Sequence, residues 1–420
     1  MALNVTIIGA GLAGLLAGRV LRDRHHVTII ERWPGGNEVG AAINLAPSAL
    51  RIAKEYGFDM AKAGSIVADT ARTFNAQGKL IQETDLSSLA ALAGEAWCFQ
   101  HRADLWEEFL RLATAPGHEV GSPGQPCKVR FNCEVVDVDV ESGLVKLADG
   151  SVISSDLVIG ADGVKSLVRP LVVGEEALRT AKPSGLSAFR FTLPAEIYQE
   201  SIPDDTRTLD STKNASLNVY LPLDGTARSI VVYPCRQYRL VNFVCIAPDD
   251  LIAAQTTESW SAEGKQADLL ATFADFAYLQ PALQRATQVM LWQLRDQDPL
   301  PTYIKGRTVL IGDAAHAMTP HQGQGGAQAV EDAEGFVLFN KDGVSRETVT
   351  LILKDFDRVR RPRASQVQGN TRDAHDRKRP EKMYEHSMYN WVYHGIQKSL
   401  AYVDRGGDLT VYDPDFLVHV

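Results

Sequence analysis

The chain opens with two short apolar runs separated by a stretch of helical spacing. Residues 5–8 and 27–30 both read VTII, and β-branched runs of this kind are typical of buried parallel strands. Between them, apolar residues recur at helical spacing over residues 12–21. This order predicts a strand–helix–strand unit near the start of the chain.

The pattern changes between residues 184 and 292. Several runs there are rich in β-branched and aromatic side chains, at residues 186–193, 215–221, 229–234 and 240–246. They predict an antiparallel sheet inserted into the first domain. After a helical stretch over 269–276, an apolar run returns at 308–311, and residues 346–403 have a charged, helical pattern.

The predicted fold class is therefore α/β. We expect a Rossmann-like nucleotide-binding domain over residues 1–180 and 290–365, small β segments included. A mainly antiparallel β-sheet domain is expected over 181–289, and a helical C-terminal segment over 366–420. Local signals predict a hairpin over 74–81, strands around turns at 142–143 and 149–150, and two helices, over 48–56 and 104–113. Ser48 and Asp104 are their candidate N-caps.

Three glycines join the first strand to the first helix. Gly9 permits a tight turn, Gly11 lets a pyrophosphate reach the backbone, and Gly14 lets helix and strand pack closely. The helix N-terminus attracts phosphate. Glu31 ends the second strand, where a carboxylate can accept from a ribose hydroxyl. The pattern predicts a dinucleotide site and favours FAD or NAD over NADP.

Two later strands end in a similar way. Residues 157–163 (LVIGADG) finish at Asp162 and Gly163, and residues 308–313 (TVLIGD) finish at Asp313. The glycine-rich loop 312–326 (GDAAHAMTPHQGQGG) follows and opens a helix. Ligands of open α/β sheets bind at the carboxyl ends of strands. We therefore expect three strands side by side, with one extended ligand across their tips.

Two side chains of the inserted sheet are candidates for the substrate site. Arg190 lies between Phe189 and Phe191, so it points away from them, and a charge in such a strand is unusual unless paired or functional. Tyr233 lies in another apolar strand. The alternatives are an arginine on a solvated face and a tyrosine that only packs.

Other polar residues have plainer explanations. His316 and His321 could act as acid or base groups, but hydrogen bonding within the loop explains them more simply. A group of arginines surrounds Pro362, and we expect a solvated helix end there rather than an anion site. These arginines are Arg358, Arg360, Arg361 and Arg363.

The composition of the chain excludes several classes of binding partner. The formal net charge of −9 argues against a nucleic-acid partner. Five scattered cysteines without metal-ligand spacing indicate reduced thiols and no metal site. The uncharged first 18 residues lack a basic leader and contain four glycines, and no run elsewhere has the length of a spanning helix. We expect a soluble, cytoplasmic protein without membrane contact, monomeric or homodimeric.

The three glycine-containing motifs together resemble those of the class A flavoprotein aromatic hydroxylases, the salicylate and p-hydroxybenzoate hydroxylase family. The resemblance covers about residues 3–365 and is greatest to fungal salicylate-hydroxylase-like enzymes of secondary metabolism, some of which dearomatise phenols. It implies a glutathione-reductase-like FAD domain. The residues implied to bind FAD are Gly9, Gly11, Gly14, Glu31, Arg32, Ala42, Arg102, Asp162, Gly163, Asp313, Pro320, Gly323, Gly325 and Gly326. Arg190 and Tyr233 match residues that hold the phenolate in dearomatising relatives.

The resemblance also implies a reaction. FAD stays bound, NADPH or NADH visits as a transient co-substrate, and a C4a-hydroperoxyflavin formed with O2 hydroxylates a small aromatic substrate. With a single glycine fingerprint, the nicotinamide has no second Rossmann domain of its own. Two alternatives stay open from sequence: a monooxygenase acting on an indole or other non-phenolic ring, and a flavin-binding sensor without turnover.

Overall fold

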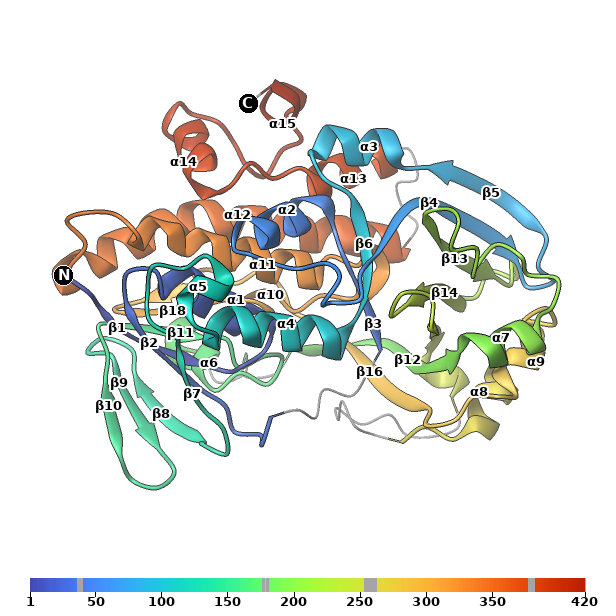
Figure 1. The fold of residues 1–420 in the computed structure, drawn as a ribbon, viewed down its shortest axis with the longest axis horizontal. Coiled ribbons are helices and arrows are strands. Elements are labelled where there is room, and N and C mark those ends of the chain that lie inside the picture. Colours follow the sequence, from blue (N-terminus) through green and yellow to red (C-terminus); the bar gives the residue numbers. More distant parts are fainter. Residues whose placement is uncertain (36–40, 176–177, 179–180, 253–262, 377–381, 420) are drawn as a thin grey trace.

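The structure, a computed structural model, describes residues 1–35, 41–175, 178, 181–252, 263–376 and 382–419. Its first layer is a six-stranded sheet in the order β17–β18–β11–β1–β2–β7 (Figure 1). Its strands are parallel except for β17. They are β1 (Asn4–Ile8), β2 (His26–Ile30), β7 (Lys128–Arg130), β11 (Leu157–Gly160), β17 (Ile304–Lys305) and β18 (Thr308–Leu310).

The three glycine-ended strands are neighbours, as the sequence predicted. Ile8 of β1 pairs with Gly160 of β11, which pairs with Leu310 of β18, so the three tips end at one edge of the sheet. Helix α1 (Leu12–Leu21) follows β1 and packs against α4 (Arg102–Thr114) and α11 (Gly325–Gly335). The sheet is therefore covered by helices, which explains its uninterrupted apolar runs.

A small antiparallel sheet lies beside this layer. It contains β8 (Val135–Asp139), β9 (Leu144–Leu147) and β10 (Val152–Ser154) and extends to the lower left of Figure 1. Gly143 and Gly150 adopt positive φ at its turns, +80° and +85°, at the positions predicted from sequence. The sheet occupies the connection between β7 and β11.

The second large layer is a nine-stranded sheet in the order β16–β12–β15–β14–β13–β4–β6–β3, with β5 paired to β4. Its strands are β3 (Ala42–Leu45), β4 (Ile66–Asn75), β5 (Leu80–Asp85), β6 (Trp97–His101), β12 (Lys182–Pro194), β13 (Ala215–Leu221), β14 (Ser229–Cys235), β15 (Leu240–Pro248) and β16 (Met290–Asp296). The predicted hairpin is β4–β5. Strands β13 and β4 pair in parallel, so the sheet is mixed and extends beyond residues 181–289 on both sides.

One face of this sheet packs on a separate apolar core. Phe189, Phe191 and Phe243 are buried there against Phe273 and Leu269. The helices on this side are α7 (Ala195–Ser201), α8 (Gln266–Thr272) and α9 (Gln280–Leu283). Because side chains alternate along a strand, Arg190 points to the opposite face, toward the first layer.

Long helices and the C-terminal segment complete the fold. Helix α12 (Val349–Asp376) has 28 residues and runs through Pro362. Three shorter helices lie above it in Figure 1: α13 (Met383–Trp391), α14 (Ile396–Asp404) and α15 (Pro414–His419). The remaining helices are α2 (Pro47–Glu55), α3 (Ser87–Ala93), α5 (Gly117–Val120), α6 (Val168–Val173) and α10 (Asp313–His316). Helices α12, α13 and α14 occupy most of the described part of residues 346–403, where the sequence predicted a helical pattern.

Both predicted helix caps are wrong. Helix α2 begins one residue before Ser48, whose hydroxyl donates instead to the carboxylate of Glu331, at 3.1 Å. Helix α4 begins at Arg102, and the carboxylate of Asp104 pairs with the guanidinium of Arg236, at 2.6 Å. In both cases a tertiary partner far along the chain competes successfully with the local backbone.

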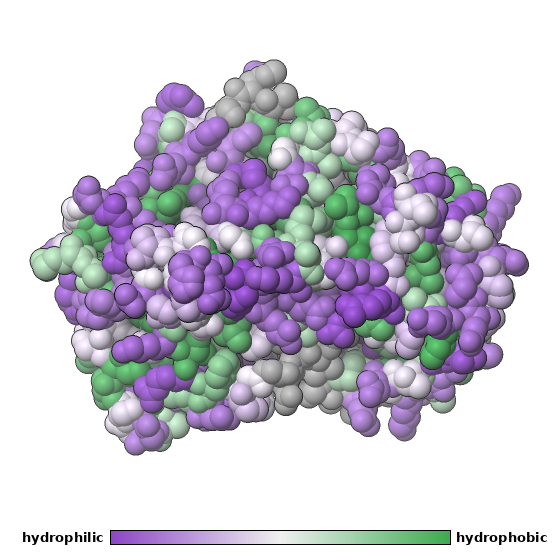
Figure 2. All heavy atoms as spheres, in the orientation of Figure 1, coloured by the Kyte–Doolittle hydropathy of each residue, from purple (hydrophilic) through white to green (hydrophobic). Residues whose placement is uncertain are grey.

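The visible surface is mixed. Figure 2 shows apolar residues in separate groups among hydrophilic ones on the face seen in Figure 1. The small sheet exposes Val136, Leu144 and Val152. Within the described ranges, no helix combines the length and apolar character needed to cross a membrane. The five cysteines are free thiols, and only Cys133 is less than fully buried.

Candidate functional site

A cavity of about 1690 Å³ lies between the two large sheets. It borders the three glycine-ended tips, the loop from Met318 to Gly326, the open face of the nine-stranded sheet, and α13. Ligand pockets usually measure about 300–1,000 Å³. This cavity therefore has room for a dinucleotide and a second molecule.

The first tip has the geometry that its glycines predicted. A Cβ on Gly9, which has φ +108°, would lie 2.3 Å from the carbonyl oxygen of Ala161, and one on Gly14 would lie 2.1 Å from that of Gly9. Both positions therefore require glycine. A Cβ on Gly11 would meet no atom within 4 Å, so the backbone there is open to the cavity, as pyrophosphate binding requires.

The carboxylate of Glu31 lies beside this turn. It accepts hydrogen bonds from the backbone N–H of Ala10, at 2.8 Å, and of Trp33, at 3.0 Å. A carboxylate has about four acceptor positions, so two stay available for ribose hydroxyls. Arg32, also predicted to bind the cofactor, lies exposed at the rim with its guanidinium 5.4 Å from the Trp33 ring.

At the second tip, Asp162 stabilises the turn itself. Its carboxylate accepts from the hydroxyl of Ser166, at 2.5 Å, and from the N–H groups of Leu167 and Val168, at 2.7 and 3.1 Å. The start of α6 is fixed in this way. Gly163 borders the cavity at φ +78°, and a Cβ there would meet nothing within 4 Å.

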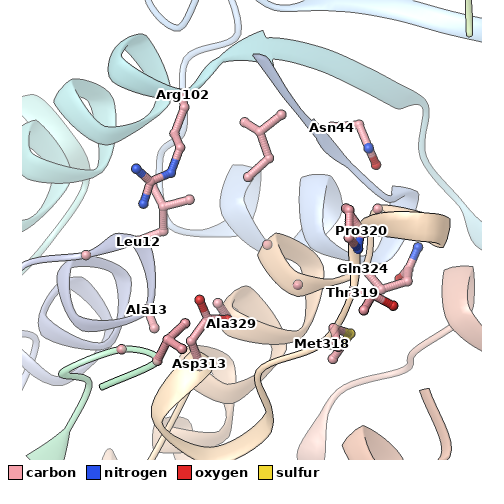
Figure 3. Close-up of a pocket in the computed structure, with 18 of the residues that line it drawn as sticks. Leu12, Ala13, Asn44, Arg102, Asp313, Met318, Thr319, Pro320, Gln324 and Ala329 are labelled. Carbon is pink, nitrogen blue, oxygen red and sulfur yellow. The ribbon is translucent and has the colours of Figure 1, made fainter. Parts of the chain in front are cut away.

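The third tip presents Asp313, the first residue of α10, to the cavity. Arg169 is fully buried and donates to the carbonyl oxygens of Asp313 and Ala314, both at 2.7 Å, which fixes this turn. In Figure 3, Arg102 reaches from α4 toward Leu12, and Asp313 lies near Ala13. Arg102 and Asp313 thus lie where a cation can contact pyrophosphate and a carboxylate can contact hydroxyls.

The glycine-rich loop leads into helix α11, whose N-terminus has no side-chain cap. Pro320 lies in a 3-10 turn (Pro320–Gln322), and Gly323 has φ +64°; a Cβ added to it would lie 2.3 Å from Asn44 Nδ2. Helix α11 then begins at Gly325 without a side-chain cap, and a Cβ on Gly325 would meet nothing within 4 Å. Free N–H groups and the positive end of the helix dipole therefore face the cavity, which suits the anionic end of a reduced flavin.

Two further residues predicted to bind the cofactor, Gly326 and Ala42, also lie at the cavity. Gly326 lies against Ile43, whose Cδ1 would be 2.9 Å from an added Cβ. Ala42 of β3 is held in place by its N–H, which donates to Asn242 Oδ1 at 2.9 Å.

Behind this loop lies a buried network of charges that the sequence interpretation missed. Arg360 donates to Glu331 and Asp332, at 2.9 and 2.8 Å, and Arg363 donates to Glu331 through two nitrogens, at 2.7 and 2.8 Å. These four side chains are at most 3% exposed. Burial alone would raise the pKa of Glu331, but Arg363 and Arg360 outweigh it, so the pKa is lowered. The expected solvated helix end is therefore wrong for Arg360 and Arg363, because α12 packs its inner face on α11.

Each of the two loop histidines has a hydrogen-bonding neighbour. His316 is fully buried, and its Nε2 lies 2.6 Å from Asp332 Oδ2, which also accepts from the N–H of Gly312. His321 Nδ1 lies 3.0 Å from the hydroxyl of Thr319. Among the described residues, no group of three or more potential metal ligands comes together.

Arg190 and Tyr233 both face the cavity. The Arg190 guanidinium lies 4.3 Å from the centre of the Trp292 ring, and no described residue accepts a hydrogen bond from it. Burial lowers the pKa of Arg190 to about 10, with Tyr233 opposing and Arg102 assisting that shift. Tyr233 is 5% exposed, and its ring centre lies 4.6 Å from that of Phe99.

Comparison with known proteins agrees with this geometry. Residues 2–371 match the family described as FAD binding domain. The FAD-dependent monooxygenase cfoG of Aspergillus candidus is 32% identical over 372 residues, which cover 87% of this chain and 84% of the relative. Salicylate hydroxylase of Pseudomonas putida is 32% identical over 385 residues, covering 88% and 84%. The structure of a salicylate hydroxylase substrate complex matches with a TM-score of 0.71 at 25% identity, covering 98% of each chain.

The open glycines, Glu31 and the uncapped start of α11 fit FAD, as the matched family requires. The chain belongs to the FAD-binding domain family and is a class A aromatic-hydroxylase-type, FAD-dependent monooxygenase.

Proposed function

We propose that this enzyme uses NADPH or NADH and O2 to hydroxylate a phenolic ring, with Arg190 and Tyr233 holding the substrate as a phenolate. Bound FAD supplies the reduction and oxygen-activation chemistry. The product gains one oxygen atom, and it is dearomatised where the attacked carbon carries a substituent that does not leave.

The proposal rests on the Arg190 guanidinium, which has no hydrogen-bonding or carboxylate partner among the residues that the structure describes. Arg190 is half-buried, with its Nε fully out of contact with solvent, and a desolvated cation without a carboxylate partner is costly, so such groups usually meet an anion. Arg190 opens onto the cavity, and Trp292 covers one face of its guanidinium. The remaining donors are therefore available to a phenolate, whose pKa such a cation lowers.

Tyr233 lies within reach of the same ring. It pairs across β14–β15 with Asn242, and Asn242 pairs across β15–β12 with Thr192, two residues from Arg190. Strand spacing and rise then separate the Cα atoms of Arg190 and Tyr233 by about 12 Å. Their side chains can contact one aromatic ring lying between them.

The rest of the cavity assists in two ways. The tips with Gly11 and Asp313 and the side chain of Arg102 hold the dinucleotide, and the start of α11 stabilises negative charge at the reacting end. Apolar side chains from the sheet, such as Val231 and Val244, keep water from the reacting atoms.

The test removes one donor at a time. Arg190→Gln should lower kcat/KM for a phenol by about 30- to 1,000-fold, the range of a lost buried charged contact, and Tyr233→Phe by less. Substrate-stimulated NAD(P)H oxidation and the mass of the product give the rates. The absorbance of bound nitrophenol gives its ionisation state. At the same pH, the wild-type protein should bind the coloured phenolate and the Arg190→Gln variant the colourless phenol.

Arg72 provides the control. It lies in the same sheet, on β4, but its guanidinium already pairs with Glu83 and Ser216. Arg72→Gln should leave phenol turnover and FAD content unchanged. Full activity in both Arg190→Gln and Tyr233→Phe would dismiss the phenolate assignment, and NAD(P)H oxidation that ignores every phenol would dismiss the substrate class.

A further inference from the structure

Helix α13 turns one face to the cavity. Four of its residues line the space, at the i, i+4, i+7 and i+8 positions of a single helical stripe. They are Met383, Ser387, Asn390 and Trp391. Met383 is 45% exposed and Trp391 only 7%, so the stripe runs from the mouth of the cavity inward. The helix follows the region that matches the FAD family, which ends at residue 371.

Hydrogen bonds attach α13 to the glycine-rich loop. Asn390 donates from Nδ2 to Gln322 Oε1, at 2.7 Å, and Gln322 ends the 3-10 turn that begins at Pro320. On its other side, Asn390 accepts from Asn370 Nδ2 of α12, at 3.0 Å. This position of α13 is therefore fixed relative to the end of the cavity where the substrate ring reacts.

Aromatic contacts attach the same helix to the substrate wall. The Trp391 ring lies 5.4 Å from Trp97, Trp97 lies 4.9 Å from Phe99, and Phe99 lies 4.6 Å from Tyr233. Trp97 is itself fixed, because its Nε1 donates to Asn44 Oδ1 at 3.2 Å. A continuous line of rings thus joins α13 to a residue proposed to hold the phenolate.

The sheet wall of the cavity is aliphatic around Arg190. Across the strands, Arg190 pairs with Val244, Val244 with Val231, and Val231 with Val219, and all four side chains line the cavity. A single arginine beside three valines suits a ligand that has one anionic group attached to a larger apolar part. A small polar ring would leave most of this surface facing water.

We infer that α13 is the specificity element of the enzyme, and that Ser387 and Trp391 select a phenol that carries an apolar extension, such as an alkyl chain. This inference rests on the proposed function, since Arg190 must hold the phenolate end. Ser387 is the small residue of the stripe and leaves space for the extension, and Trp391 limits that space on the inner side.

The experiment measures ligand binding by the change in the absorbance of bound FAD, so it does not require turnover. Resorcinol and pentylresorcinol are titrated into wild-type protein and into Ser387→Phe. The variant should weaken pentylresorcinol about tenfold or more and change resorcinol less than about threefold, because the added ring occupies the space of the chain. Ser387→Val, a smaller insertion, should give a weaker version of the same pattern.

Glu385→Phe is the matched control, since it adds the same ring to α13 at a position that does not line the cavity. It should leave both dissociation constants unchanged. Equal weakening of both phenols by Ser387→Phe, or of neither, would overturn the role of α13. A wild-type protein that binds both phenols but forms no product would refute the proposed function alone, and the comparison of dissociation constants would still decide the role of α13.

Discussion

Replacing Arg363 by methionine tests whether the buried charges behind the glycine-rich loop stabilise the fold. The carboxylate of Glu331 accepts four hydrogen bonds: two from Arg363, one from Arg360 at 2.9 Å and one from Ser48 at 3.1 Å. Arg363 also donates to the carbonyl oxygen of Tyr389 on α13, at 3.0 Å. Arg363→Met removes three of these contacts and leaves one arginine facing two buried carboxylates.

The expected loss is large. Removing one partner of a fully buried ion pair costs about 3–5 kcal/mol, because the remaining charge stays buried without compensation. Proteins of this kind unfold with free energies of about 5–15 kcal/mol. Arg363→Met should therefore remove about a fifth or more of the stability and loosen α13 against α11.

Chemical denaturation of the FAD-bound protein, followed by tryptophan fluorescence and by flavin release, gives the free energies of unfolding. Arg358→Met is the matched control. Arg358 lies on the same helix and also pairs with two carboxylates, Asp355 at 3.1 Å and Asp404 at 2.8 Å, but its side chain is 45% exposed. The control should lose at most about 1 kcal/mol.

The double variant Glu331→Gln/Arg363→Met isolates the charge effect. It should be more stable than the sum of the two single losses predicts, by about 1–3 kcal/mol, since neither charge is then left alone. If Arg363→Met costs no more than Arg358→Met, the network does not stabilise the fold in the way argued from its burial.

Two further predictions use simpler changes. Gly11→Ala should leave the melting temperature of the FAD-free protein unchanged and weaken FAD binding at least about tenfold, measured by flavin fluorescence, since the added methyl projects only into the cavity. Gly14→Ala should instead lower the melting temperature, because its methyl clashes with Gly9. The reverse result for the two variants would contradict the assigned roles. Burial raises the pKa of Glu334 to about 7, whereas its pKa in the unfolded chain is about 4.3. The protonated Glu334 therefore stabilises the fold fully at pH values below about 4.3, and this contribution is lost as the pH rises through about 7. Glu334→Gln should remove up to about 4 kcal/mol of this pH dependence in denaturation series, and an unchanged profile would show that Glu334 is ionised throughout.

Local patterns in the sequence predicted much of the cofactor site. Gly9, Gly11 and Gly14 act through their own backbone, and Glu31 lies a fixed distance along a strand–helix–strand unit, so sequence spacing determines their geometry. The adjacency of β1, β11 and β18 followed from their shared glycine-ended pattern. These features depend on neighbours along the chain or on one sheet.

The features that the sequence did not predict depend on packing between segments far apart along the chain. Arg360 and Arg363 have the sequence context of a solvated helix end, and only the burial of α12 against Glu331 and Asp332 makes them internal. An acidic pair inside the otherwise small, apolar stretch after Gly326 was the available signal. No signal in the sequence indicated that Trp292 lies beside Arg190, because the register between neighbouring strands determines that contact.

The strand order of the nine-stranded sheet limits how the substrate site can be exchanged between relatives. Only four of its strands, β12 to β15, lie within residues 181–289, whereas β3, β4, β5, β6 and β16 come from the segments on either side. A chimaera that swaps only the inserted segment must therefore form new parallel pairing at β13–β4 and new antiparallel pairing at β12–β16 with foreign partners. Strands β3 to β6, β16 and helix α13 would have to be added to carry the sheet side and the α13 side of the cavity into another enzyme.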